Sequence, residues 1–227
     1  MEWLVLLLII AAAINASRVR PQYVGNRIAF YKKHLGVQFI IVVVVLFLVP
    51  AVFWFSPFEI WKPKTLFLDD VDWLSILISV SSVNFIFSFT NLIYKNRDLL
   101  HESVIFGLPN YLLPSTWKEW WIFTCFISGG VVFEELIFRL VLFGLLYETL
   151  GLTSWPLIVS ATIIFSLGHA YQGIKGLVSS SLMGILFAII YLITETLWWP
   201  IAIHAIHNYS IVVYSARRII AKQREVS

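Results

Sequence analysis

Long apolar stretches separated by short polar ones run through almost the whole chain. Seven apolar segments can be drawn, at residues 3–16, 37–58, 73–94, 119–147, 152–170, 175–194 and 198–215. An α-helix needs about 20 such residues to cross a bilayer, and no polar stretch between the segments is long enough for a second domain. The pattern predicts an all-α fold, a polytopic transmembrane helical bundle of about seven helices.

Composition supports a chain that lies in the lipid bilayer. Hydrophobic residues make up 59% of the 227 residues and charged residues 13%, and the mean hydropathy is +0.86, far from the values of a soluble domain. The net charge of +3 comes from Lys and Arg in loops, which orient helices in a membrane, so no nucleic-acid role is implied. We expect the first segment to be a retained helix, because Glu2 precedes it and Arg18 and Arg20 follow it, the reverse of a cleaved signal peptide.

The positions of the basic residues predict an orientation. Thirteen of the sixteen Lys and Arg residues fall in the loops 17–36, 95–118 and 171–175 and in the tail 216–227. On the opposite side, the loop 59–72 contains two lysines and four acidic residues. The positive-inside rule therefore places the N-terminus outside the cell and the basic tail in the cytoplasm.

Three of the apolar segments contain strongly polar residues. The segment 119–147 carries Glu134, Glu135 and Arg139, the segment 152–170 carries His169, and the segment 198–215 carries His204, His207 and Asn208. A charge in the middle of a membrane helix costs on the order of 2.5–3.5 kcal/mol, so such residues are usually functional.

Helical spacing makes the two adjacent acids unequal. Glu135 and Arg139 are four residues apart, so their side chains meet on one helix face and neutralise each other. Glu134 is rotated from Glu135 by about 100° and is the acid left without a local partner. His204 and Asn208 are also four residues apart and point to the same place.

Each polar residue also has a purely structural interpretation. The pair Glu135–Arg139 can equally be an ion pair that only stabilises the fold. The isolated Asn84 and Asn91 are best explained as residues that form interhelical hydrogen bonds. His34 and His101 fall in predicted loops, where solvated surface is the better explanation. One acid, two imidazoles and an amide on three helices nevertheless contain every part of a hydrolytic site.

These three segments resemble the signature of the CAAX protease and bacteriocin-processing (CPBP, or Abi) family of intramembrane endopeptidases. The motif EExxxR appears as Glu134, Glu135 and Arg139, FxxxH as Phe165 and His169, and HxxxN as His204 and Asn208. The resemblance covers a protease core at residues 119–215, between N-terminal helices (1–118) without a recognised motif and the tail 216–227. It implies a multi-pass membrane protease, with a prokaryotic origin expected, whose partner is a peptide or membrane-protein substrate.

Peptide hydrolysis assigns a role to each residue of the site. Glu134 is the expected base that activates water, and His169 holds the same water and passes a proton to the leaving amine. His204 and Asn208 donate hydrogen bonds to the developing oxyanion. Arg139 offsets Glu135, and Phe165 packs one turn before His169.

Other chemistries and functions fit the same residues. A zinc ion held by Glu134, His169 and His204 would make a metalloprotease, but Asn208 is a poor zinc ligand and no HExxH pair is present. We therefore expect no metal or other cofactor. A bacteriocin-immunity or scaffold protein without essential proteolysis is one alternative, and a proton-coupled transporter is another, although no inverted repeat is seen.

Overall fold

The computed structural model describes residues 7, 9–11, 26–53, 104–105, 108–109, 112–194 and 196–226. These residues are helical apart from a short antiparallel pairing of β1 (Val104–Ile105) with β2 (Leu108–Pro109) and the connecting turns. The expected all-α class is therefore confirmed for this part of the chain. The segment 73–94, most of the segment 3–16, and the residues Asn84, Asn91 and His101 lie outside it, so the count of seven helices and the orientation of the termini stay predictions.

The C-terminal half contains the helices that the apolar pattern predicts. The segment 119–147 corresponds to one continuous helical run, made of α4 (Trp117–Glu135), the π-helical turn η4 (Leu136–Val141) and α5 (Leu142–Leu150). It is followed by α6 (Ser154–Leu167), the short 3-10 helix η5 (Ala170–Gln172), α7 (Gly173–Thr194) and α8 (Trp198–Val226). The predicted boundaries of the segments 152–170 and 175–194 are correct to within three residues.

Two helices are longer than predicted. The helix α2 (Arg27–Phe53) begins ten residues before the predicted segment 37–58, so His34 lies in a helix, with its ring 4.2 Å from that of Phe30, and its placement in a loop is wrong. The helix α8 continues through the predicted tail. Ser215, Arg218 and Ile219 recur at helical spacing and are buried, so packing extends the helix beyond the apolar segment.

Local signals in the sequence set both ends of the run α4–η4–α5. Thr116 caps α4 by accepting a hydrogen bond from the backbone N–H of Glu119 at 3.2 Å, and the Glu119 carboxylate accepts one from the N–H of Ser115 at 2.7 Å. At the other end Gly151 adopts φ 62°, and the N–H groups of Gly151 and Leu152 close back on the carbonyls of Tyr147 and Leu146. A left-handed residue of this kind is the usual end of a helix.

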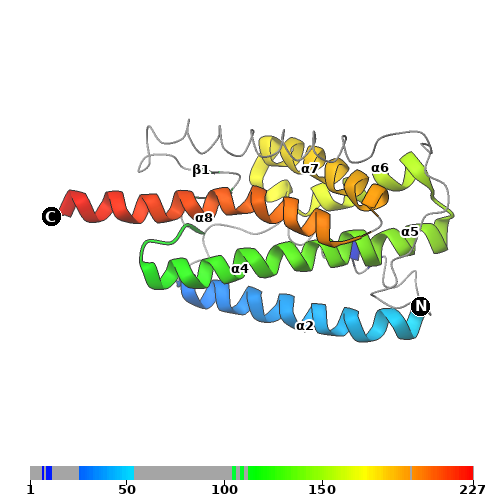
Figure 1. Cartoon of the computed structure of the whole chain (residues 1–227), viewed down its shortest axis with the longest axis horizontal. Helices are drawn as coiled ribbons and strands as arrows, with labels where there is room; N and C mark the ends of the chain where they lie inside the picture. The colour runs from blue at the N-terminus through cyan, green and yellow to red at the C-terminus, as the bar shows by residue number, and fades with distance from the viewer. Residues whose placement is uncertain are drawn as a thin grey trace.

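The helices pack as a bundle in which α4 lies between α2 and α8, while α6 and α7 pack on each other and α7 contacts α8 (Figure 1). Small residues permit the close approaches. A Cβ at Gly129 would lie 2.7 Å from Leu35 of α2, and one at Gly184 would lie 3.1 Å from Phe165. These two glycines therefore serve helix packing.

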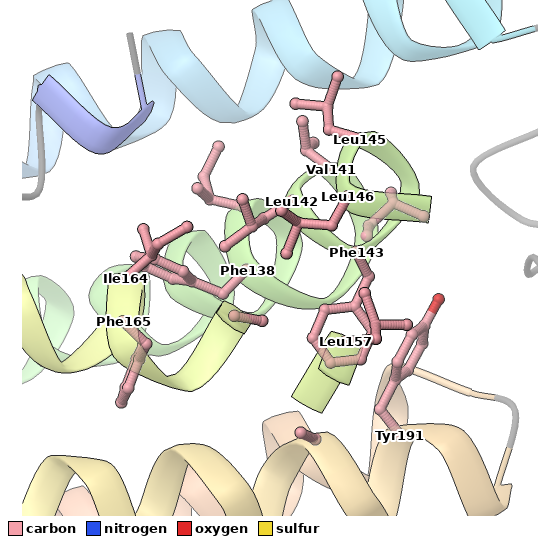
Figure 2. Close-up of a cluster of buried hydrophobic side chains, with 14 of the residues drawn as sticks. Phe138, Val141, Leu142, Phe143, Leu145, Leu146, Leu157, Ile164, Phe165 and Tyr191 are labelled. Carbon is pink, nitrogen blue, oxygen red and sulfur yellow. The ribbon is translucent and has the colours of Figure 1, made fainter. Parts of the chain in front are cut away.

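The core gathers where η4 and α5 meet α6 and α7. Figure 2 shows aliphatic and aromatic side chains from these four elements pointing toward one another, with Phe138 and Phe165 on one side of the cluster and Phe143 and Tyr191 on the other. The ring centroids of Phe138 and Phe165 are 5.0 Å apart, and those of Phe143 and Tyr191 are 5.7 Å apart. This packing fixes the helical run that carries the acidic residues against α6, which ends two residues before His169.

The outer faces of the bundle are apolar. Val159 and Ile163 on α6, and Val178 and Leu182 on α7, are exposed and stand four residues apart on their helices. Contiguous apolar faces of this kind are unusual in contact with water and suit contact with lipid. Within the described residues, the segment Gly176–Thr194 is long and apolar enough to cross a membrane, with a mean hydropathy of 2.2.

Candidate active site

Three helices bring the four predicted catalytic residues to one cavity. Glu134 lies at the C-terminal end of α4, His169 follows α6 and caps η5, and His204 and Asn208 lie in the first half of α8. All four side chains line a cavity of about 170 Å³. Residues that are up to 74 positions apart in the sequence therefore share one site, as the motif pattern predicted.

Glu134 faces both histidines. Its Oε2 atom lies 3.9 Å from Nε2 of His169 and 3.8 Å from Nε2 of His204. The same oxygen is buried and has no hydrogen-bond partner among the described residues. Both distances are too long for a direct hydrogen bond, but they suit groups that bind the same small molecule, such as one water.

Both imidazole rings are held through Nδ1. Nδ1 of His169 lies 3.0 Å from the carbonyl oxygen of Phe165, one turn earlier on α6, and Nδ1 of His204 lies 2.7 Å from Oε1 of Glu135. These acceptors require the proton on Nδ1 when the ring is neutral, which leaves the lone pair on Nε2. Each histidine therefore presents an acceptor nitrogen on its side facing Glu134.

Asn208 completes the pair on α8. Its Nδ2 group donates a hydrogen bond to Nε2 of His204 at 3.1 Å. The expectation that the two side chains share one helix face is confirmed. In the neutral state, however, His204 accepts at Nε2 and cannot donate there, so of the two residues only Asn208 presents a donor to the cavity.

Glu135 and Arg139 form a buried pair beneath the cavity. The Glu135 carboxylate is 0% exposed, and its Oε2 atom lies 3.2 Å from Nε of Arg139, which is 2% exposed. The guanidinium also donates to the carbonyl oxygen of Gly184 at 3.1 Å. The predicted pairing is confirmed, but the sequence did not reveal that Glu135 binds His204 as well, because that contact joins two helices 69 residues apart.

Two phenylalanine rings pack against the Arg139 guanidinium and the two catalytic histidines. The Arg139 guanidinium carbon lies 4.8 Å from the ring centre of Phe165 and 5.5 Å from that of Phe187. The Phe165 ring lies 4.7 Å from the His169 ring, as predicted, and the Phe187 ring stacks on His204 at 4.7 Å. Phe187 was missed, since it is one of many apolar residues in α7 and no feature of the sequence marks it.

The π-helical turn η4 begins directly after Glu135 and contains Arg139. The N–H of Leu142 bonds to the carbonyl of Ile137, five residues earlier, which is the mark of this wider turn. Single π turns inside α-helices are frequent at functional sites. Here the turn lies between the acidic pair and the helix end that packs into the core.

The donor atoms around Glu134 have the chemistry of zinc ligands, but their spacing differs from that of a zinc site. Bonds of about 2.0–2.2 Å in a tetrahedron place ligand atoms about 3.4 Å apart, whereas Oε2 of Glu134 is 3.8 and 3.9 Å from the two Nε2 atoms. Nε2 of His204 is also engaged by Asn208. Within the described residues, no three His, Cys, Asp or Glu side chains have the arrangement of a metal site.

Several other polar residues line the cavity, and the sequence pattern did not select them. His207, to which the motifs assigned no role in the site, is among them. The others come from α2, η5, α7 and α8: Gln38, Tyr171, Gln172, Ser179, Ser180 and Ser210. No motif marked them, because single Gln and Ser residues are common in helices and near their ends.

Comparison with known proteins supports the resemblance drawn from the motifs. Residues 116–210 match the family described as "Type II CAAX prenyl endopeptidase Rce1-like". A curated relative, "Putative membrane peptidase YdiL" of Bacillus subtilis (strain 168), is 38% identical over 84 residues, which is 37% of this chain and 33% of the relative. The matched part thus spans about a third of that relative's length, and no solved structure matches. The resemblance to the CAAX protease family is confirmed over residues 116–210, and both findings indicate a membrane protein.

Proposed function

Residues 116–210 match the type II CAAX prenyl endopeptidase Rce1-like family, and from this premise we propose that the protein is an intramembrane endopeptidase. The observation that carries the proposal is the convergence of the Glu134 carboxylate on the Nε2 atoms of His169 and His204 in one cavity. The protein would work as a multi-pass protein of a prokaryotic cell membrane. Its substrate would be a peptide or a membrane-protein segment.

Glu134 is the base in the proposed reaction. A water molecule donates one hydrogen bond to Oε2 of Glu134 and the other to Nε2 of His169, and its remaining lone pair points at the substrate carbonyl carbon. As the new C–O bond forms, Glu134 accepts the water proton. Glu134 then passes this proton to Nε2 of His169, and His169 donates it to the leaving nitrogen as the C–N bond breaks, which returns both side chains to their starting protonation states.

The oxyanion is stabilised from α8. Asn208 has a second N–H besides the one that it donates to His204, and this group can bind the negative oxygen of the tetrahedral intermediate. His204 accepts the other Asn208 N–H at Nε2 and binds Glu135 through Nδ1, so it holds this amide in place. Loss of one oxyanion donor typically slows an enzyme by about 10²–10³-fold.

Arg139 neutralises Glu135, the second of the two adjacent acids. Because its guanidinium binds the Glu135 carboxylate, a single unpaired carboxylate remains in the site. The aromatic rings of Phe165 and Phe187 cover the guanidinium and both imidazoles. They exclude water from the layer beneath the cavity and hold the catalytic rings in place.

A panel of labelled, membrane-inserted peptides tests the proposal. The panel contains apolar peptides of about 25 residues, long enough to span a bilayer, and one peptide with a farnesylated C-terminal CAAX sequence. Purified protein in lipid vesicles is incubated with each peptide, and products are identified by mass spectrometry. We expect cleavage of at least one peptide by the wild type and none by Glu134→Gln. No cleavage of any peptide would favour the immunity or scaffold alternative.

Metal removal separates the glutamate mechanism from its zinc alternative. If Glu134 activates water without zinc, dialysis against a strong chelator should leave the rate of peptide cleavage unchanged. Elemental analysis should then find far less than one zinc per chain. Activity that is lost on chelation and restored by zinc alone would instead support the metalloprotease.

A further inference from the structure

A glutamine on α2 reaches the cavity from outside the family segment. Gln38 lines the same cavity as Glu134, His169 and Asn208, although α2 lies far before residue 116, where the family match begins. The helix α2 packs directly on α4. The cavity therefore has a wall that the three motifs do not supply.

Two glycines of α4 make room for this side chain. A Cβ at Gly129 would lie 3.4 Å from Oε1 of Gln38, and a Cβ at Gly130 would lie 3.4 Å from its Nε2. The carboxamide thus lies within van der Waals distance of the place that either Cβ would take, so side chains longer than alanine at these positions would compete for its space.

The oxygen atom of this carboxamide has no hydrogen-bond donor within the part of the chain that the structure describes. Oε1 of Gln38 is buried and has no partner among the described residues, a property that it shares with Oε2 of Glu134 in the same cavity. Buried amide oxygens are nearly always hydrogen-bonded, because an unpaired one costs free energy. In a cavity wall, the missing partner is most simply a group of a bound molecule.

The position along α4 indicates which group this is. Gly130 and Glu134 are four residues apart and lie on one helix face, about 6 Å apart along the axis. An extended peptide advances about 3.3 Å per residue. A peptide held along α4 with its reacting bond at Glu134 would therefore present a backbone amide to Gln38 about two residues away.

We infer that Gln38 binds the backbone of the substrate peptide about two residues from the bond that is cleaved. Its carboxamide accepts a backbone N–H at Oε1 and donates to a backbone carbonyl at Nε2, the pair of bonds that an extended peptide offers. This inference rests on the proposed function, since it names the substrate contact of the same site. It assigns substrate binding to the N-terminal helices, for which the motifs give no role.

Peptide binding to an inactive protein tests the inference separately from hydrolysis. The dissociation constants of the labelled peptide panel are measured in vesicles for Glu134→Gln alone and with Gln38→Met added, a change that keeps the length of the side chain. The control adds Ile40→Met, at an exposed position on the same helix. We expect Gln38→Met to raise the Kd by about 5–30-fold and the control to raise it less than twofold.

A second readout distinguishes a hydrogen bond from packing. Replacing backbone amides of the probe one at a time by esters removes one N–H each. One ester should weaken binding to the Gln38 protein and have no effect on the Gln38→Met protein. Equal Kd values for both proteins, absence of binding by any panel peptide, or a loss of affinity that is the same for every ester would overturn the inference. If no peptide is cleaved, the proposed hydrolytic function is contradicted. The comparison of Kd values still decides whether Gln38 binds the peptide.

Discussion

At the scale of single residues, Glu134 and Glu135 are neighbours with opposite surroundings. Glu135 is fully buried, with its Oε2 3.2 Å from Nε of Arg139 and its Oε1 2.7 Å from Nδ1 of His204, so each oxygen faces a nitrogen of a fixed partner. Glu134 is 25% exposed and faces the cavity, with histidine nitrogens at 3.8 and 3.9 Å. A carboxylate that is paired on all sides serves structure, whereas one with an open side can bind and activate water.

This difference predicts a loss of stability for Glu135→Gln. The change keeps the volume of the side chain but removes the charge that pairs with Arg139 and holds His204. Breaking a buried pair by removing one partner typically costs about 3–5 kcal/mol. We expect a clearly lower melting temperature and lower yield, with activity reduced because His204 loses its orientation.

The matched control is Glu148→Gln, the same chemical change at an exposed position of α5. Its melting temperature, measured by thermal unfolding in detergent, should stay close to that of the wild type. A Glu135→Gln protein as stable as the Glu148→Gln protein would contradict the structural role of the buried pair.

At the scale of elements, the site depends on the close approach of α6 and α7. Gly184 accepts a hydrogen bond from Arg139 through its carbonyl, and a Cβ there would lie 3.1 Å from Phe165 and 3.3 Å from Thr162. Both neighbours are buried, so they have little room to move. The spacing of these two helices therefore sets the position of Phe165, and with it the His169 ring.

Gly184→Ala should destabilise the protein by about 1–3 kcal/mol, because it overpacks this contact. Cleavage of the peptide panel should also slow, since the Phe165 ring must shift. Gly36→Ala is the control: it lies on an exposed face of α2 with no atom within 4 Å of the added Cβ. That change should stabilise the protein by about 0.5–1 kcal/mol, because alanine favours the helix. If Gly184→Ala and Gly36→Ala changed the melting temperature equally, the account of α6–α7 packing would be contradicted.

The sequence predicted most of the C-terminal elements and the members of the site, for physical reasons. The lengths of the apolar segments located the helices. The four-residue spacing paired Glu135 with Arg139 and His204 with Asn208. The π turn η4 was not predictable, because LIFRLV has the composition of any apolar α-helix. The contacts of Glu135 with His204 and of Gln38 with the cavity depend on how helices pack, which local patterns do not encode.

At the scale of the whole molecule, the site lies inside a bundle with apolar outer faces. The cavity is lined from α2, α4, α6, α7 and α8, so helices on both sides of α4 contribute. A peptide that reaches Glu134 would therefore contact several helices of the bundle at once. This arrangement fits a substrate that is itself embedded in the membrane.

The distribution of basic residues predicts how this bundle sits in the membrane. The N-terminus and the loops 59–72, 148–151 and 195–198 should face outside, and the C-terminal tail should face the cytoplasm. A tag fused after Ser227 should react with an impermeant label only after the cells are opened. A tag inserted in the loop 59–72 serves as the control and should react in intact cells. Labelling of the Ser227 tag in intact cells would show that the orientation is the reverse of the predicted one.

The most direct test of the central claim is the turnover rate of Glu134→Gln on a peptide that the wild type cleaves, measured after chelator treatment of both proteins. Gln keeps the size of the side chain but cannot accept the water proton. We predict a fall in kcat of about 10²–10⁴-fold with a melting temperature close to that of the wild type. A folded Glu134→Gln protein that cleaves the peptide at nearly the wild-type rate would contradict the assignment of Glu134 as the base.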